Sequence, residues 1–237
     1  MTGFPRYAIY YASPRGATLD RFGTELLGYD AWTGEDLPFP DGVTEAVPDW
    51  RDITSDPRKY GFHATLKAPF ALAPGRTEAE LVAACAGFAG EPRAIPAFRP
   101  VTDSISGFIA VIPAGRSAQL EALAADCVTA FDCFRAPLTE RDRARRNPAE
   151  LTERQRDHLD RWGYPYVMDE FRFHMTLTGR LDASRRGSVL TMLRKRFAAI
   201  AVDSLSVDRI ALFRQDAADA RFRIIGAWPL ASAEVQP

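Results

Sequence analysis

Two short stretches of the sequence share one pattern: Phe62-His63-Ala64-Thr65-Leu66 and Phe173-His174-Met175-Thr176-Leu177. The chain has only three histidines in 237 residues, and two of them hold the same place in this pattern. Side chains on a β-strand point alternately to opposite faces, so residues two apart share a face. Each stretch therefore predicts a strand that is apolar on one face and carries a histidine and a threonine on the other.

A longer repeat surrounds these motifs and indicates a duplicated supersecondary unit. Strand and helix patterns follow one another in the same order in both halves, at residues 7–11 and 17–27 and again at 108–112 and 117–131. A helix follows each motif, and short strands close each half, at residues 78–88, 184–197, 95–101, 204–213 and 222–228. We expect a single α+β domain of two pseudo-symmetric lobes, each an antiparallel sheet with helices on its outer face, over residues 1–102 and 103–237.

Two segments do not fit the repeat. Residues 30–58 are rich in Pro, Gly and Asp and predict a long ordered loop. Residues 135–160 form a charged insertion, in which residues 152–159 predict a short helix after Asn147-Pro148. Its arginines are interspersed with acidic residues, which favours a solvated helical flap over a basic binding surface. The arginines in question are Arg141, Arg143, Arg145 and Arg146.

Composition narrows the class of protein. Apolar residues make up 46% of the chain, and 30 Lys and Arg balance 31 Asp and Glu, for a formal charge of -1. This composition predicts a folded globular chain with no overall attraction to nucleic acid or to an anionic membrane. The three cysteines form no CxxC pair, and the N-terminus shows no leader pattern. We expect a cytoplasmic protein that does not bind a membrane and whose cysteines are reduced.

The polar faces of the two motifs suggest the chemistry of the site. If the lobes are related by an approximate twofold axis, His63, Thr65, His174 and Thr176 converge in one cleft. The alternation rule adds Lys67 and Arg172 to the same faces. Hydroxyls and cations can hold phosphate oxygens, while one imidazole removes a proton and the other supplies one. The set therefore predicts catalysis on a phosphate diester, with Lys67 and Arg172 as substrate-binding residues.

Other ligands and cofactors have less support in the sequence. Tyr10 and Tyr166 are further candidates to line the cleft, because one lies on the first strand and the other precedes the second motif. No glycine-rich phosphate loop of the ATP or NAD type is present, so no cofactor is expected. Zinc would need a third ligand, and neither motif has Cys, Asp or Glu two residues after its histidine. We expect no metal; a pair of purely structural histidines remains the alternative interpretation.

The paired motifs resemble the 2H phosphoesterase superfamily. The sequence around the motifs, residues 60–70 and 162–179, resembles one branch of this superfamily, the phosphonate metabolism proteins. That branch is a domain of unknown function found beside carbon-phosphorus lyase components. This resemblance implies a metal-independent two-lobed fold, with His63 and His174 as the acid and base and with Thr65 and Thr176 as phosphate ligands. It also implies a small cyclic phosphate as substrate, and the phosphonate setting suggests a phosphoribosyl 1,2-cyclic phosphate that is opened to a bisphosphate.

Two other functions stay open at this point. An RNA or nucleotide 2',3'-cyclic phosphodiesterase would use the same residues, although the balanced charge disfavours a long polyanion as partner. A non-catalytic sensor of a phosphorylated ligand would use the same cleft, but binding alone does not require two imidazoles. The sequence does not assign the acid and the base between the two histidines, and it does not give the oligomeric state.

Overall fold

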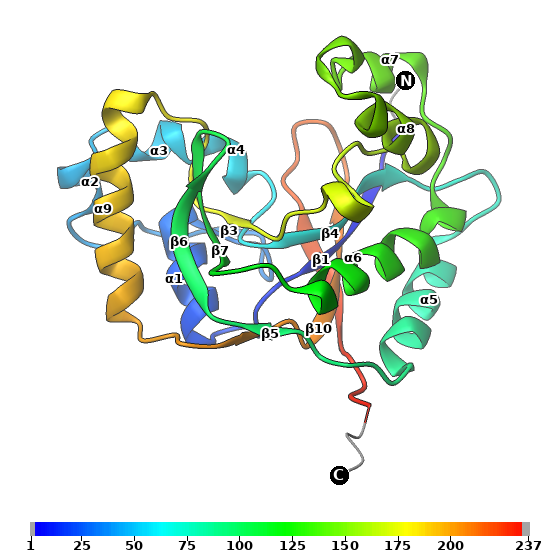
Figure 1. Cartoon of the computed structure of the whole chain (residues 1–237), viewed down its shortest axis with the longest axis horizontal. Helices are drawn as coiled ribbons and strands as arrows, with labels where there is room; N and C mark the ends of the chain where they lie inside the picture. Colours follow the sequence, from blue (N-terminus) through cyan, green and yellow to red (C-terminus); the bar gives the residue numbers. More distant parts are fainter. Residues whose placement is uncertain (1–2, 234–237) are drawn as a thin grey trace.

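The computed structural model describes residues 3–233, and its central feature is one seven-stranded antiparallel sheet (Figure 1). The strands are ordered β11-β10-β1-β4-β8-β7-β6 across the sheet. Their bounds along the chain are β1 (Arg6–Tyr11), β4 (Ala64–Ala71), β6 (Pro100–Ile105), β7 (Phe108–Pro113), β8 (Met175–Thr176), β10 (Arg209–Gln215) and β11 (Arg223–Pro229). The α+β fold class with antiparallel strands is confirmed.

The two histidine motifs meet in the middle of this sheet. β4 begins within the first motif, β8 consists of two residues of the second, and the two strands pair through Ala64 and Met175. Antiparallel pairing about this point puts each histidine across from the threonine of the other motif, His63 from Thr176 and His174 from Thr65. The sheet therefore brings both histidines and both threonines to one place.

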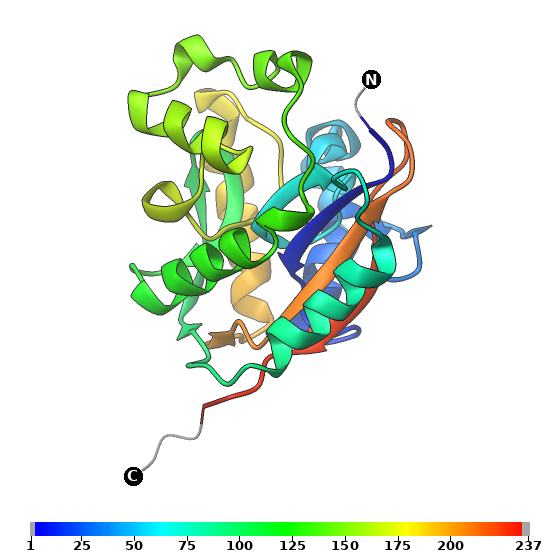
Figure 2. The ribbon, with the colours of Figure 1, turned by 90° about the vertical axis from the view of Figure 1, so that its right-hand side faces the viewer.

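Four helices of ten or more residues cover one face of the sheet. They are α1 (Thr18–Leu27), α5 (Glu78–Gly90), α6 (Ala118–Ala130) and α9 (Ala183–Ala199). Each contributes a leucine to the same buried cluster: Leu19, Leu81, Leu123 and Leu193. Figure 2 shows α5 lying across β10 and β11 at one end of the sheet, and Figure 1 shows α9 beside β6 at the other end. These four helices lie on the outer face of the strands, as predicted.

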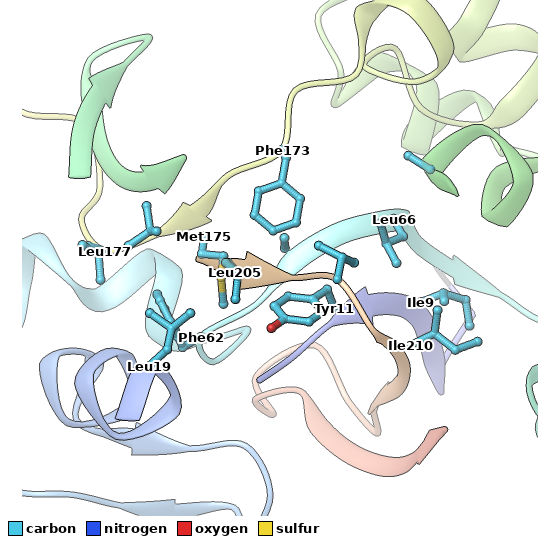
Figure 3. Close-up of a cluster of buried hydrophobic side chains, with 14 of the residues drawn as sticks. Ile9, Tyr11, Leu19, Phe62, Leu66, Phe173, Met175, Leu177, Leu205 and Ile210 are labelled. Atoms are coloured by element: carbon cyan, nitrogen blue, oxygen red, sulfur yellow. The ribbon is translucent and has the colours of Figure 1, made fainter. Parts of the chain in front are cut away.

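The apolar residues of the two motifs form the centre of this core (Figure 3). Leu66 from the first motif and Phe173, Met175 and Leu177 from the second are all 5% exposed or less. They pack in one cluster with residues of the strands beside them, such as Ile9. Burial of these side chains, at roughly 1.5–3 kcal/mol each, holds the polar faces of the motifs outward.

The division into two sequence-contiguous lobes is wrong in one respect. β10 and β11 come from the C-terminal part of the chain, yet β10 pairs with β1, and β11 pairs with β10. The strands expected in residues 103–237 are thus split between the two ends of the sheet. A sequence repeat does not reveal which edge a returning strand joins, because either edge buries its apolar face equally well.

The segment expected as a long loop, residues 30–58, contains short elements. These are β2 (Tyr29–Asp30), β3 (Glu35–Asp36), α2 (Val43–Ala46), α3 (Trp50–Ile53) and α4 (Ser55–Arg58). The fully buried indole of Trp50 donates a hydrogen bond to the carbonyl of Leu26 at 2.8 Å, and Arg58 Nε donates to that of Leu27 at 2.5 Å. The last carbonyls of a helix lack intrahelical partners, so these two side chains tie the segment to the end of α1.

The charged insertion is mostly helical and lies above the sheet in Figure 1. It contains α7 (Glu140–Ala144) and α8 (Glu153–Trp162), with single turns η1 (Asp132–Phe134), η2 (Pro148–Glu150) and η3 (Met168–Glu170) around them. α8 overlaps the short helix expected at residues 152–159, and it begins with a capping box in which Thr152 and Gln155 exchange hydrogen bonds. A small ladder of β5 (Ala97–Phe98) and β9 (Leu205–Ser206) completes the fold. No helix within residues 3–233 is long and apolar enough to cross a membrane.

Candidate active site

A cavity of about 340 Å³ lies on the face of the sheet opposite the long helices, and both motifs line it. His63, Thr65, His174 and Thr176 all contribute to its wall. The remaining lining residues are Arg6, Tyr10, Asp56, Pro57, Tyr60, Ala68, Pro69, Phe108, Arg146, Tyr164, Thr178, Gly179 and Arg180. The four residues expected to perform catalysis therefore share one cavity.

His63 is held in one orientation by its own strand and by aromatic rings. Its Nδ1 lies 2.9 Å from the carbonyl oxygen of Gly61, and its Nε2 lies 3.4 Å from the hydroxyl of Thr65. A carbonyl can only accept, so Nδ1 carries a proton and donates it, which leaves Nε2 as the nitrogen that can accept a proton. The ring of Tyr10 stacks on the imidazole with centroids 3.9 Å apart. Tyr10 thus lies in the site, where it supports His63.

The position of that carbonyl depends on Gly61. This residue has φ +75°, a left-handed conformation that L side chains rarely adopt, and a Cβ placed there would lie 2.7 Å from the Cβ of Ala31. Only glycine fits both the backbone angle and the space. The glycine therefore serves the orientation of His63.

His174 repeats the same arrangement in the second motif. Its Nδ1 lies 2.7 Å from the carbonyl oxygen of Arg172, two residues earlier, as Gly61 is to His63. The same tautomer follows, with Nε2 left for the cavity. Its aromatic neighbour is Phe108, whose ring lies 5.4 Å away and is tilted by 54°. The two histidines are thus matched in tautomer and differ in their surroundings.

Burial makes both histidines weak bases. It lowers the pKa of His63 to about 4, against the opposing effect of the hydrogen bond to Gly61, and a charge on His174 lowers that pKa further. Burial also lowers the pKa of His174, against the opposing hydrogen bond to Arg172. Both imidazoles are therefore neutral near pH 7 until an anion enters the cavity and favours a protonated ring.

Lys67 does not lie in the site, and its prediction as a substrate-binding residue was wrong. Tyr10 pairs with Thr65 but the preceding residue, Ile9, pairs with Lys67, so β4 has one extra residue at this point. Such a β-bulge breaks the alternation of faces. Lys67 points instead into the core, where it is 3% exposed and its Nζ donates to the carbonyl of Val128 at 2.9 Å and to Asp132 Oδ1 at 3.0 Å. Ala68 takes its place on the cavity wall.

Arg172 and Tyr166 lie beside the histidine cavity. They line an adjoining cavity of about 310 Å³, which also contacts Thr65 and His174. Tyr166 is 48% exposed and packs edge-on against the ring of Tyr164, with centroids 5.6 Å apart. The two residues are near the second motif as predicted, but neither lines the cavity that contains both histidines.

Several cavity residues were not predicted from sequence. Arg6 at the start of β1, Arg180 after β8 and Arg146 from the charged insertion all line the histidine cavity. The run of arginines in the insertion was a visible signal for Arg146, although its mixed charge favoured a solvated surface. Arg6 and Arg180 carry no comparable pattern. Among residues 3–233, no three His, Cys, Asp or Glu side chains come close enough together to form a cation site.

Comparison with known proteins gives relatives that share part of their length with this chain. The protein named ribose 1,5-bisphosphate phosphokinase PhnN from Janthinobacterium sp. (strain Marseille) is 35% identical over 223 residues, which is 92% of this chain and 49% of that protein. The protein of the same name from Laribacter hongkongensis (strain HLHK9) is 34% identical over 223 residues, or 92% and 50% of the two chains. The chain spans about half the length of these curated relatives.

Among solved structures, that of E. coli LigT complexed with 3'-AMP is 13% identical, with a TM-score of 0.39, and the match covers 96% of this chain and 99% of that one. A family model described as "Protein of unknown function (DUF1045)" matches residues 65–223, which include Thr65 and the whole second motif. The resemblance to a domain of unknown function is thereby confirmed. Since this match extends over well more than half of the sequence, the chain belongs to the DUF1045 family.

Proposed function

We propose that this chain is a phosphodiesterase that hydrolyses a small cyclic phosphate, with His63 and His174 as its acid and base pair. The observation that carries the proposal is the matched orientation of the two imidazoles. Each donates from Nδ1 to a main-chain carbonyl and so leaves Nε2 for a cavity lined by both rings. Hydrolysis of a diester needs one group that removes a proton from water and another that protonates the leaving oxygen.

In the proposed reaction, neutral His63 accepts a proton from a water molecule whose oxygen forms a new bond to phosphorus. The bond from phosphorus to one ester oxygen of the ring breaks, and protonated His174 gives its proton to that oxygen. One water is consumed and the ring opens to a phosphate monoester with a free hydroxyl. The histidines end with their protonation states exchanged, and proton exchange with solvent restores them.

The surroundings of the two rings support this division of roles. Three aromatic rings approach His63, those of Tyr10 at 3.9 Å and of Tyr60 and Phe213 at 5.9 Å between centroids. An apolar enclosure favours the neutral form of an imidazole, which is the form that a base needs. His174 has the ring of Phe108 at 5.4 Å, so a single proton in the cavity is better accommodated on His174.

Hydroxyls and guanidinium groups on the cavity wall suit a phosphate. The side chains of Thr65 and Thr176 line the cavity, and in the proposed complex their hydroxyls donate to non-bridging oxygens, on which negative charge grows as water attacks. The guanidinium groups of Arg6, Arg146 and Arg180 add charge-assisted donors around the same space. A bound anion also raises the pKa of both imidazoles, so substrate binding itself favours the protonated imidazole that acts as the acid.

The relatives suggest which cyclic phosphate is used. Their name, ribose 1,5-bisphosphate phosphokinase, describes proteins whose matched portion is about half of their length. Opening of a phosphoribosyl 1,2-cyclic phosphate at the oxygen of C2 yields ribose 1,5-bisphosphate, the compound in that name. We therefore propose phosphoribosyl 1,2-cyclic phosphate, in phosphonate catabolism, as the substrate.

A nucleotide 2',3'-cyclic phosphate is the second candidate, and one observation favours it. The cavity that adjoins His174 has an aromatic wall made by Phe108, Tyr164 and Tyr166, on which a nucleobase could stack. This candidate predicts preference for a substrate with a base attached.

The test is a panel of ribose 1,2-cyclic, phosphoribosyl 1,2-cyclic, nucleotide 2',3'-cyclic and nucleotide 3',5'-cyclic phosphates, with ring opening followed by phosphorus NMR. Each substrate is assayed with and without EDTA, so that dependence on a metal ion would be seen as loss of activity when EDTA is present. His63→Ala and His174→Ala should each lower kcat by about 10² to 10⁴, the usual contribution of one general acid or base.

His158→Ala is the matched control, since His158 lies on α8, contacts Asp169 at 2.9 Å and lines neither cavity. It should retain wild-type turnover. Full activity of both motif variants on every substrate that the wild type opens would exclude the proposed mechanism.

A further inference from the structure

A cavity distinct from the two described above, of about 210 Å³ and here called the second cavity, adjoins the histidine cavity on the side of β1 and the charged insertion. The two cavities share four lining residues, Arg6, Tyr60, Pro69 and Arg146. Arg145 and Arg135 line only the second one. A molecule bound at the histidines can therefore extend past Arg6 and Arg146 into a space with further arginines.

Arg6 is held at the boundary of the two cavities by a neutral partner. Its Nε donates to Gln215 Oε1 at 2.9 Å, and its second terminal nitrogen also contacts that oxygen. Gln215 is 4% exposed, and its amide nitrogen donates to the carbonyl of Ala220 at 2.7 Å, which fixes the oxygen toward Arg6. A buried neutral amide thus orients the guanidinium group, and the positive charge of Arg6 is not compensated by this partner.

The arginines of this cavity lie close to one another without a matching set of carboxylates. Burial lowers the pKa of Arg6, and the positive charges of Arg145 and Arg146 lower it further. Within residues 3–233, none of these three arginines has a carboxylate oxygen within 4.0 Å; Arg146 instead lies over the ring of Tyr164, at 5.0 Å. Like charges held together are unfavourable until an anion joins them.

The other charged groups of the cavity are already engaged. Arg135 forms an ion pair with Asp132 at 2.8 Å. Asp142 is the acidic residue in the lining, and its carboxylate accepts the hydroxyl hydrogen of Thr139 at 2.7 Å, within the cap of α7. The cluster of Arg6, Arg145 and Arg146 therefore gives this cavity a net positive charge.

We propose that this second cavity binds a second phosphate group of the substrate, so that the protein acts on cyclic phosphates that also carry a phosphate monoester. The inference rests on the proposed function for the substrate's reacting end, and it adds the residues that select its other end. Arg6 and Arg146 lie between the two phosphates, and Arg145 contacts only the distal one. A dianionic monoester suits several guanidinium donors better than a neutral hydroxyl does.

The experiment compares kcat/KM for two substrates that differ only in this group, 5-phosphoribosyl 1,2-cyclic phosphate and ribose 1,2-cyclic phosphate. The wild type should prefer the phosphorylated one. Arg145→Gln should reduce that preference by about 10-fold to 100-fold, the range for loss of one hydrogen bond between charged groups. Arg141→Gln, the same change at an exposed position one turn earlier, in α7 and outside both cavities, should keep the preference. Equal rates for the two substrates in the wild type, or an unchanged preference in Arg145→Gln, would overturn the proposal.

A binding measurement separates this proposal from the proposed reaction. Calorimetry with ribose 5-phosphate, which has no cyclic phosphate to hydrolyse, should show binding to the wild type that Arg145→Gln weakens and Arg141→Gln does not. If no cyclic phosphate is turned over but this pattern holds, the proposed reaction fails and the phosphate subsite stands. If turnover occurs but ribose 5-phosphate binds equally to all three proteins, the subsite fails alone.

Discussion

Replacement of Lys67 by methionine distinguishes a lysine that binds substrate from one that supports the sheet. The side chain is 3% exposed and donates to the carbonyl of Val128 and to Asp132. Val128 lies in the last turn of α6, where carbonyls lack partners within the helix, so this substitution leaves a buried acceptor unsatisfied. An unsatisfied buried acceptor of this kind lowers the free energy of unfolding by about 1–3 kcal/mol.

Two effects keep the expected loss near the middle of that range. Asp132 keeps its ion pair with Arg135 at 2.8 Å, so no carboxylate is left without a partner. Methionine is apolar and fits a buried position, which removes the cost of keeping an ammonium group out of water. We expect the free energy of unfolding to fall by about 2 kcal/mol, which corresponds to a drop in Tm of about 4–8 °C for a chain of this size.

The assay combines urea unfolding with steady-state kinetics on the cyclic phosphate that the wild type opens. Because Lys67 lies on the helix-covered face, KM should match that of the wild type at a temperature where both proteins are folded. Lys195→Met, which changes an exposed lysine of α9, serves as the control and should affect neither quantity. A large rise in KM with unchanged stability would show that Lys67 reaches the substrate and would refute the reasoning from the β-bulge.

Two further predictions concern His63. The pH profile of kcat/KM should be bell-shaped with its maximum below about pH 6.5, because burial lowers the pKa of both imidazoles in the free protein and the acid loses its proton as pH rises; a maximum on the alkaline side of pH 7 would contradict this. Gly61→Ala should lower both kcat and stability, since its new Cβ would lie 2.7 Å from that of Ala31 and would displace the carbonyl that orients the ring. Gly75→Ala shares the positive φ without any neighbour within 4 Å, so it should lose about 1 kcal/mol of stability and keep its activity.

The sequence was sufficient for the parts of this site that depend on short-range periodicity. Alternation along a strand placed the histidine and threonine of each motif on one face and Leu66, Met175 and Leu177 in the core, as observed. The same rule failed two residues later, at Lys67, because a β-bulge depends on how two strands meet, and one strand alone does not reveal it. The alternation rule is therefore reliable within a motif and weak beyond it.

Arg6 and Arg146 illustrate a different limit. They are 140 positions apart by their numbers, and they reach the same cavity because β1 lies beside β4 while the charged insertion extends over the sheet. No local pattern encodes that meeting, since each arginine is locally indistinguishable from a solvated one. Likewise β10 pairs with β1, although most of the chain separates the two strands, and no local pattern encodes that pairing.

The proposed mechanism assigns two different roles to a pair of histidines that stand in repeated motifs. Each motif supplies the same local device, a carbonyl two residues before the ring that accepts from Nδ1. What differs is supplied by the rest of the chain: the rings of Tyr10, Tyr60 and Phe213 approach His63, whereas Phe108 approaches His174. A charge on either imidazole disfavours a charge on the other, so only one ring is readily protonated. The less apolar surroundings of His174 favour protonation of that ring. Local repetition thus sets the two tautomers alike, and the unequal surroundings are the basis for the proposal that His63 is the base and His174 the acid.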